Sequence, residues 1–249
     1  MEDAVYLEMS AVEARHWWYV GRRRILQDEL SRHLAPAPHG GRRVLEVGCG
    51  TGGNLGLLKG FGAVDAIEPN NTARALAGRS AGVALHSGGL PNALPQFEVG
   101  FDLIAAFDVI EHVEEDKASI EALAARLRPG GVLAVTVPAF AGLWSRHDER
   151  HHHKRRYSRR GLKDIFRDSG LEIARLTYFN SILFPIAASV RLVERAGLIE
   201  SSGADKLPSE PLNGLLAGIF GSEARLLRWV SPPFGLSLLL IARRPAGPV

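Results

Sequence analysis

Cysteine is almost missing from this sequence, in which Cys49 is the single one among 249 residues. A disulfide-stapled scaffold and a four-cysteine zinc module are therefore both excluded. Long apolar runs are missing too, because the longest uncharged stretch, residues 129–145, contains Pro-Gly-Gly and falls short of the roughly 18 residues of a membrane span. The acidic start MEDAVYLEMS lacks the features of a signal peptide, so we expect a cytoplasmic protein.

The chain also carries little net charge. The net charge is +3 at pH 7 and 46% of the residues are hydrophobic, which is an ordinary globular composition. The basic residues gather in residues 146–160, where seven Lys or Arg stand against two acids, and the rest of the chain sums to about −2. One basic loop on a nearly neutral protein argues against a nucleic-acid partner.

What the sequence does contain is a regular alternation of short apolar runs and amphipathic stretches. Strands that alternate with helices predict an α/β fold with a doubly wound, mostly parallel, seven-stranded sheet. We expect strands at residues 43–47, 63–67, 83–86, 101–107, 132–137, 171–178 and 235–243, and helices at residues 70–79, 114–128 and 158–169. The predicted parts are an N-terminal helical arm (1–40), a core (41–179), a helical insertion (180–230), and the last strand with a tail (231–249).

A glycine-rich turn, residues 46–53, joins the first predicted strand to a helix. Glycines let the backbone approach a ligand closely, and a helix N-terminus offers free N–H donors. Gly48, Gly50 and Gly53 satisfy G-x-G-x-x-G, and Glu68 follows 20 residues after Gly48, as in a dinucleotide site. This pattern alone does not choose between NAD and another adenosine cofactor.

Two further features favour a cationic cofactor. Glu46 places a carboxylate just before the glycines, where it repels a pyrophosphate and attracts a sulfonium or ammonium. The fourth predicted strand also ends in Phe-Asp-Val-Ile-Glu-His-Val, residues 107–113, which nicotinamide folds do not require.

The motifs VLEVGCGTG (residues 44–52) and DVIEH (residues 108–112) resemble those of class I S-adenosylmethionine-dependent methyltransferases. Within that class they are similar to the branch that resembles the ubiquinone-pathway O-methyltransferases. The resemblance covers residues 43–137, and its other matching positions are Glu68, Leu90, Pro91, Phe101, Asp102, and residues 128–131. It implies a Rossmann-like methyltransferase sheet and S-adenosyl-L-methionine (SAM) as the cofactor.

The resemblance also implies cofactor contacts. Glu46 and the glycine backbone would line the methionine part, Glu68 would bridge the ribose hydroxyls, and Asp108 would lie beside the sulfonium. An acid that often holds the adenine amino group is absent here, so Ser87 or backbone is expected to replace it. The predicted cofactor set is Glu46, Gly48, Cys49, Gly50, Gly52, Glu68, Pro69, Ser87, Asp108 and Val109, with Trp17 and Tyr19 from the arm.

A hydroxyl acceptor must lose its proton during methyl transfer, which favours a nearby histidine. His112, at the start of the helix predicted after the fourth strand, is the candidate base, and Glu111 is predicted to orient it. The alternative is that both residues only pack and cap that helix. A Glu-His pair can also bind a divalent metal with further ligands, as similar quinone O-methyltransferases suggest, but the predicted site contains no metal.

The polar segment after the fifth predicted strand borders the ligand crevice in this architecture. His147 and His151, together with Asp148, are predicted to assist the acid–base chemistry or to bind a metal. Arg155, Arg156 and Tyr157 are predicted to clamp an anionic group of the acceptor. The competing interpretation is a solvated basic surface.

The arm and the insertion leave several alternatives open. Trp17 or Tyr19 can pack near the sulfonium or merely dock the arm on the sheet, and the run 22–24 of three arginines can reach the cofactor carboxylate or be solvated. The apolar stretches of the insertion can cover a lipid-linked acceptor, form a homodimer contact, rest peripherally on a membrane, or be buried in the core.

We therefore predict a SAM-dependent methyltransferase that acts on a small-molecule or lipid-linked acceptor, which we expect to be anionic, with O-methylation favoured. The alternatives are an N-methyltransferase, an RNA methyltransferase, which the single basic loop disfavours, and a protein that binds the cofactor without turnover.

Overall fold

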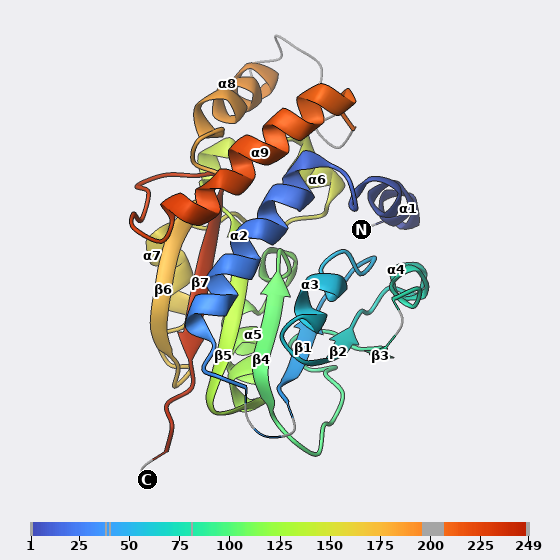
Figure 1. The fold of residues 1–249 in the computed structure, drawn as a ribbon, viewed down its shortest axis with the longest axis vertical. Coiled ribbons are helices and arrows are strands. Elements are labelled where there is room, and N and C mark those ends of the chain that lie inside the picture. The colour runs from blue at the N-terminus through green and yellow to red at the C-terminus, as the bar shows by residue number, and fades with distance from the viewer. Residues whose placement is uncertain (1, 38, 40, 81, 196–206, 248–249) are drawn as a thin grey trace.

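One sheet of seven strands organises the chain in a computed structural model that describes residues 2–247 except 38, 40, 81 and 196–206 (Figure 1). The strands are β1 (Arg43–Val47), β2 (Ala63–Ile67), β3 (Val83–His86), β4 (Phe101–Phe107), β5 (Leu127–Pro138), β6 (Glu172–Phe179) and β7 (Ser237–Arg243). They lie in the order β3-β2-β1-β4-β5-β7-β6, and only β7 runs antiparallel to its neighbours. The predicted α/β, mostly parallel sheet is confirmed.

Helices cover both faces of this sheet, which explains why the central strands are apolar along their whole length. The helices are α1 (Asp3–Val12), α2 (Trp17–His33), α3 (Leu55–Lys59), α4 (Asn71–Ala77), α5 (Asp116–Ala125), α6 (Arg146–Arg150), α7 (Arg159–Ile165), α8 (Phe184–Arg195) and α9 (Glu210–Leu226). Ile25 of α2, Leu58 of α3 and Phe220 of α9 belong to the core on one face. Ile120 of α5 and Leu162 of α7 belong to the core on the other face.

The strand boundaries agree closely with the sequence prediction, with one exception at β5. We expected a helix up to residue 128 and a strand from 132, but α5 ends at Ala125 and β5 already begins at Leu127. Leu127 pairs with Phe101 at the start of β4, and the left-handed φ of +77° at Gly130 lets the strand continue through Pro-Gly-Gly with a shifted register.

The predicted arm consists of two helices, of which α1 was not anticipated as a separate element. Helix α1 lies beside α4, where the Asp3 carboxylate accepts hydrogen bonds from Asn70 (2.9 Å) and Thr72 (2.7 Å). Asn70 also caps α4, because its side-chain oxygen accepts the Ala73 N–H at 2.8 Å. The N-terminal arm is thereby attached to the β2–α4 side of the sheet.

Helix α2 crosses the sheet next to α9, and the two pack without a side chain between them at Gly21 (Figure 1). A Cβ atom at Gly21 would lie 2.5 Å from Cδ1 of Phe220. The Phe220 ring in turn stacks on Phe179 of β6, with centroids 6.3 Å apart. The helical insertion therefore continues the layer that the arm begins.

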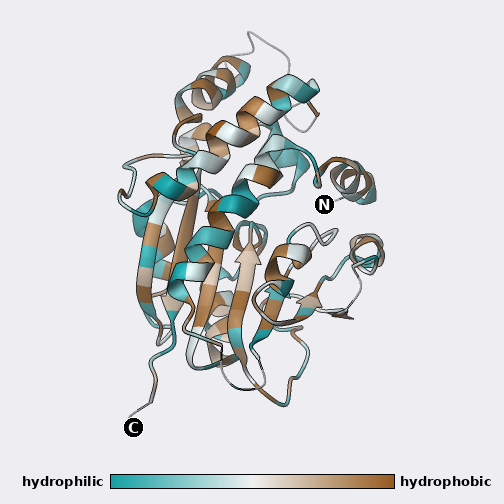
Figure 2. Cartoon of the chain, in the orientation of Figure 1, coloured by the Kyte–Doolittle hydropathy of each residue, from teal (hydrophilic) through white to brown (hydrophobic). Residues whose placement is uncertain are grey.

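Figure 2 shows hydrophobic residues along α8 and α9. Several apolar residues of the insertion are exposed. Ile186 is 67% exposed, Leu215 60% and Trp229, just beyond α9, 89%. Residues 196–206, inside the predicted insertion, lie outside the described residues. In the part of the chain that the structure describes, no helix combines the length and apolar character needed to cross a membrane.

Candidate functional site

The carboxyl ends of the parallel strands meet at one edge of the sheet, and the backbone there is unusual. Asp108 after β4, Phe140 after β5 and Asn180 after β6 all have a left-handed φ, of 55°, 59° and 54°. Non-glycine residues adopt this conformation at a cost of about 1–3 kcal/mol, and such residues cluster at ligand sites. The edge where the ligand crevice is predicted therefore carries three residues in the strained conformation that is common at ligand sites.

The glycine turn after β1 brings its backbone against the end of β4. Gly48 has a φ of +68°, and a Cβ atom there would lie 2.6 Å from a methyl group of Val109. Glycine is thus required both by conformation and by space. Cys49, between the glycines, is buried, and burial raises the pKa of its thiol, so it remains a packing residue rather than a nucleophile.

Glu68, at the end of β2, ties the glycine turn to the start of α4. Its Oε2 accepts the Gly50 N–H at 2.8 Å, and its Oε1 accepts the Asn70 N–H at 3.0 Å. Tyr6 of α1 packs close by, and burial together with the Glu68 charge raises the pKa of Tyr6 to about 12. Helix α1 thus covers the predicted ribose-binding carboxylate, a contact that the sequence analysis missed.

Glu46, the predicted partner of the cationic end of the cofactor, is buried inside the site. Its Oε1 accepts a hydrogen bond from Asn54 at 2.9 Å, and its Oε2 has no hydrogen-bond partner. Burial raises the pKa of Glu46 to about 8, so the carboxyl is mostly protonated at neutral pH until a cation approaches.

Asp108 forms an ion pair with Arg22, which the sequence analysis had only noted as part of a basic run. The Arg22 side chain is buried, lies 4.8 Å from the Trp18 ring centroid, and leaves its Nε without a hydrogen-bond partner. The Thr136 hydroxyl also donates to Asp108 at 3.1 Å. An arginine and an aspartate that lie side by side can bind both the carboxylate and the ammonium of an amino-acid group.

The rest of the arm contacts the glycine turn through Glu13, another residue missed from the sequence. The Thr51 hydroxyl donates to its carboxylate at 2.7 Å, and burial raises the pKa of Glu13. The signal that could have revealed this role is an acid four residues before the aromatic residue Trp17 of the arm.

Four other residues predicted to contact the cofactor lie beyond the ends of β2 and β3 or on α2. Pro69 and Ser87 are exposed beyond the ends of β2 and β3. The Trp17 ring lies 5.9 Å from the Phe220 centroid, and the Tyr19 ring lies 5.0 Å from Trp18. Trp17 thus docks the arm on α9, and Trp18 is the ring that lies over the site arginine.

Two predicted catalytic side chains and one further histidine lie close together near Asp108. Glu111, His112 and His153 each offer a ligand atom, and these atoms all lie within 4.8 Å of one another. His112 does not start the helix that we expected, because it lies in the 3₁₀ turn Ile110–His112, and α5 begins at Asp116. His153 comes from the loop after β5 and was missed as a site residue.

The electrostatics of this cluster follow from its burial. Glu111 has no exposed surface, and neither of its carboxyl oxygens has a hydrogen-bond partner. Burial and the nearby Asp108 charge raise the pKa of Glu111 well above its ordinary value. Burial and His153 lower the pKa of His112 to about 4, so its ring is neutral at neutral pH. The predicted His147 and His151 lie next to each other, with ring centroids 4.2 Å apart.

The three residues of the predicted anion clamp are paired within the protein, and their contact with an acceptor stays a prediction. Arg156 is buried and donates to both oxygens of Asp148 at 2.8 and 2.9 Å and to the Ala139 carbonyl at 3.0 Å. Arg155 and the Tyr157 hydroxyl donate to Asp116 at 2.8 and 2.9 Å. These hydrogen bonds hold the loop after β5 in place, and Arg156 also lines the neighbouring pocket.

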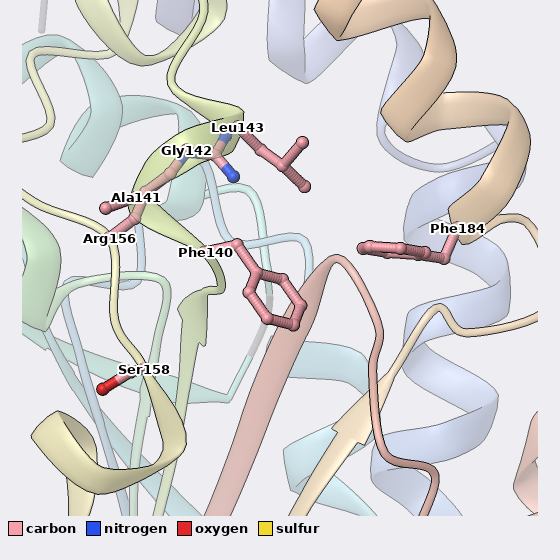
Figure 3. A pocket seen from close by; sticks show the side chains of 7 residues that line it. All are labelled: Phe140, Ala141, Gly142, Leu143, Arg156, Ser158 and Phe184. Carbon is pink, nitrogen blue, oxygen red and sulfur yellow. The ribbon is translucent and has the colours of Figure 1, made fainter.

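An apolar pocket of about 540 Å³ lies between that loop and the start of α8. Figure 3 shows the side chains of Phe140 and Leu143 reaching toward Phe184. The Phe140 ring also stacks on Tyr178, with centroids 5.2 Å apart. The pocket offers apolar and aromatic surface next to the histidine-bearing loop.

Comparison with known proteins agrees with this geometry. A family model described as a methyltransferase domain matches residues 18–176. A ubiquinone biosynthesis O-methyltransferase of Chelativorans sp. (strain BNC1) is 28% identical over 155 residues, which are 53% of this chain and 61% of that protein. The chain thus matches less than two thirds of the length of that relative.

Solved structures share the fold at low identity. A chain of the complex between the Haloferax volcanii Trm112 methyltransferase activator and a methyltransferase has a TM-score of 0.63 at 19% identity, over 99% of this chain and 97% of that one. A Haemonchus contortus phosphoethanolamine N-methyltransferase 2, solved with S-adenosyl-L-methionine, has a TM-score of 0.56 at 18% identity, over 87% of this chain and 51% of that one.

The family match covers well over half of the chain, including β1 to β5 and the glycine turn. The predictions of a class I methyltransferase with a Rossmann-like sheet and of S-adenosyl-L-methionine as its cofactor are therefore confirmed. The chain belongs to the methyltransferase domain family.

Proposed function

We propose that this methyltransferase transfers the methyl group of SAM to a hydroxyl oxygen of a small or lipid-like acceptor. The observation that carries the proposal is the meeting of Glu111, His112 and His153 beside Asp108. A hydroxyl acceptor must lose a proton as it attacks, whereas a neutral amine attacks through a lone pair that it already has. A cluster of imidazoles and a carboxyl suits the first of these reactions.

The donor part of the proposal rests on the charges around the glycine turn. Glu46, Glu68 and Asp108 surround the turn, and Arg22 is the buried cation among them. We place the donor's sulfonium and ammonium near Glu46 and Asp108, and its carboxylate near Arg22. The donor is then attracted at both ends of its amino-acid group.

The acceptor part of the proposal rests on the apolar pocket. Phe140, Leu143 and Phe184 line it together with Arg156 and Ser158, and α8, which begins at Phe184, carries further exposed apolar side chains. An acceptor with an aromatic ring and an alkyl chain fits this lining better than a sugar or a nucleotide. Because Arg155 and Arg156 are internally paired, an anionic group on the acceptor is no longer part of the proposal.

The direct test is turnover of matched acceptors that differ only in the reacting atom. We expect an alkylated phenol to yield S-adenosylhomocysteine at least about tenfold faster than the corresponding alkylated aniline, and shortening the alkyl chain to raise KM. The measurement is S-adenosylhomocysteine formation by mass spectrometry. Preference for the aniline would indicate N-methylation, and donor binding without product over the panel would indicate a protein without turnover; either contradicts the proposal.

A second prediction concerns the proton on Glu46. With a pKa of about 8, the Glu46 carboxyl is protonated in about nine tenths of the molecules at pH 7. A cation bound beside it should cause that proton to dissociate. Donor affinity should therefore rise as the pH increases from 6 to 8. Calorimetry at pH 7 in buffers of different ionisation enthalpy should show release of close to one more proton in the wild type than in Glu46→Gln. Equal proton release by the two proteins would place the donor cation elsewhere.

A further inference from the structure

We propose that the exposed face of α9 binds the same face of a second copy of this chain, with the two helices antiparallel about a two-fold axis at Gly218. One side of α9 is buried against α2, where Phe220 meets Gly21 (Figure 1). The opposite side of α9 faces solvent. A two-fold axis makes such a contact self-complementary, because each protomer contributes the same surface.

The exposed face of α9 is apolar where a fully solvated helix is polar (Figure 2). Leu212, Leu215 and Leu226 lie on it, Trp229 follows just past the helix end, and each has at least 39% of its surface exposed. Leu226 and Trp229 follow Leu215 by 11 and 14 residues, about three and four helical turns, so these side chains share one side of the helix. Clustered apolar side chains of this kind are what protein interfaces bury.

Charge complementarity favours a second copy in the antiparallel direction. Glu210 lies in the first turn of α9 and Arg225 in the last turn, and both are exposed. Within the part of the chain that the structure describes, neither side chain has an ion-pair or hydrogen-bond partner. Glu210 lies eight residues before Gly218 and Arg225 seven residues after it, so a two-fold axis there brings the acid of each copy beside the arginine of the other. The face therefore carries both members of an ion pair that forms twice.

The glycines of α9 fit the close approach of another helix. Gly221 is explained within the protomer, because a Cβ atom there would lie 2.8 Å from Arg24. A Cβ atom at Gly214 or Gly218 would meet nothing within 4 Å among the described residues, although glycine destabilises a helix interior relative to alanine. Gly214 and Ser222 lie four residues before and after Gly218, so the axis sets small residues opposite small residues. The two helices can then pack closely.

The size of this face sets the expected affinity. A helix of 17 residues is about 25 Å long, so its exposed face is smaller than the roughly 800 Å² that each partner contributes to a stable interface. We therefore expect a reversible dimer with a dissociation constant on the order of micromolar rather than a permanent one.

The test is sedimentation equilibrium of the full chain at concentrations from about 1 to 300 μM. We expect a monomer–dimer equilibrium, and we expect Leu215→Glu to raise its dissociation constant at least about tenfold, because each copy would bury an unpaired charge. The matched control is Val99→Glu, which introduces the same charge at an exposed apolar residue in the loop before β4. This control should dimerise like the wild type.

Two further changes separate the two-fold contact from general damage to the fold. Gly218→Ala should raise the Tm of the dilute monomer, because alanine favours the helix, and yet weaken the dimer, because added methyl groups separate the helices. Arg225→Glu should raise the dissociation constant about threefold or more. Adding Glu210→Arg to Arg225→Glu should restore dimerisation, because the exchanged charges again lie opposite each other.

A chain that stays monomeric up to about 300 μM would overturn the proposal, and binding of that monomer to phosphatidylglycerol vesicles would assign the face to a membrane instead. A dimer whose dissociation constant is the same in wild type, Leu215→Glu and Gly218→Ala would overturn the assignment to α9. A double charge exchange that dimerises no better than Arg225→Glu would overturn the antiparallel arrangement. These measurements need neither donor nor acceptor, so they stand apart from the outcome of the turnover assay.

Discussion

Glu68→Gln is expected to lower the affinity for SAM at least about 100-fold, because the two charge-assisted hydrogen bonds that we propose from the ribose hydroxyls to Glu68 would contribute roughly 1.5–3 kcal/mol each. Glu68 already accepts the N–H groups of Gly50 and Asn70, so its two oxygens are fixed in position before the donor arrives. An amide also turns one N–H donor toward these backbone donors. Calorimetric titration with SAM measures the loss.

The matched control for this prediction is Asp65→Asn on the same strand. Asp65 is partly buried and pairs with Arg43 and His86 away from the carboxyl end of β2. This variant should bind SAM like the wild type, and thermal melts should show that both variants fold. A Glu68→Gln protein that binds SAM within about threefold of wild type would remove Glu68 from the donor site.

Arg156→Ala is expected to lower the free energy of unfolding by about 3–5 kcal/mol, more than any other substitution proposed. The substitution leaves the buried carboxylate of Asp148 without its main partner. Asp148 has no exposed surface. Burial raises the pKa of Asp148, but the hydrogen bonds from His153 and Arg156 outweigh it and hold the pKa well below its ordinary value. The lost free energy corresponds to a Tm decrease of roughly 6–20 °C for a domain of this size.

Two comparison variants separate the ion pair from general damage to the loop. Arg155→Ala removes a more exposed arginine next in the chain, whose pairing with Asp116 and Glu114 should be worth less than about 1 kcal/mol. Adding Asp148→Leu to Arg156→Ala should restore part of the lost stability, because the uncompensated charge disappears. Denaturant unfolding measures all three, and equal losses for Arg155→Ala and Arg156→Ala would refute the assignment.

The strands and the positions of the glycine turn and its acidic neighbours could be predicted because their signals are local. Apolar runs with short turns located β1 to β4 to the residue, and the glycine turn with Glu46, Glu68 and Asp108 follows directly from the ends of those strands. The start of β5 was misplaced because Pro-Gly-Gly normally interrupts a strand. Only the pairing of Leu127 with Phe101 keeps the strand continuous.

The acceptor side was harder to predict because its roles depend on contacts between distant residues. A run of arginines and histidines after β5 gives no hint which side chain is buried, and pairing with Asp148 turned the predicted clamp residue Arg156 into a structural one. Helix α1 has a weakly amphipathic, acidic sequence, so its position over Glu68 arises from the tertiary contacts of Tyr6 and Asp3. The predictions of a homodimer and of peripheral membrane contact stay untested.

The contact between Gly21 and Phe220 links two parts of the molecule that the sequence presents as separate. Arg22 follows directly after Gly21 and reaches Asp108, while Phe220 belongs to α9 in the insertion. A close-packed contact without a side chain as spacer has no slack, so a displacement of one helix is transmitted to the other. Helices α2 and α9 are therefore packed as one unit, and the position of the Arg22 guanidinium beside Asp108 depends on that packing.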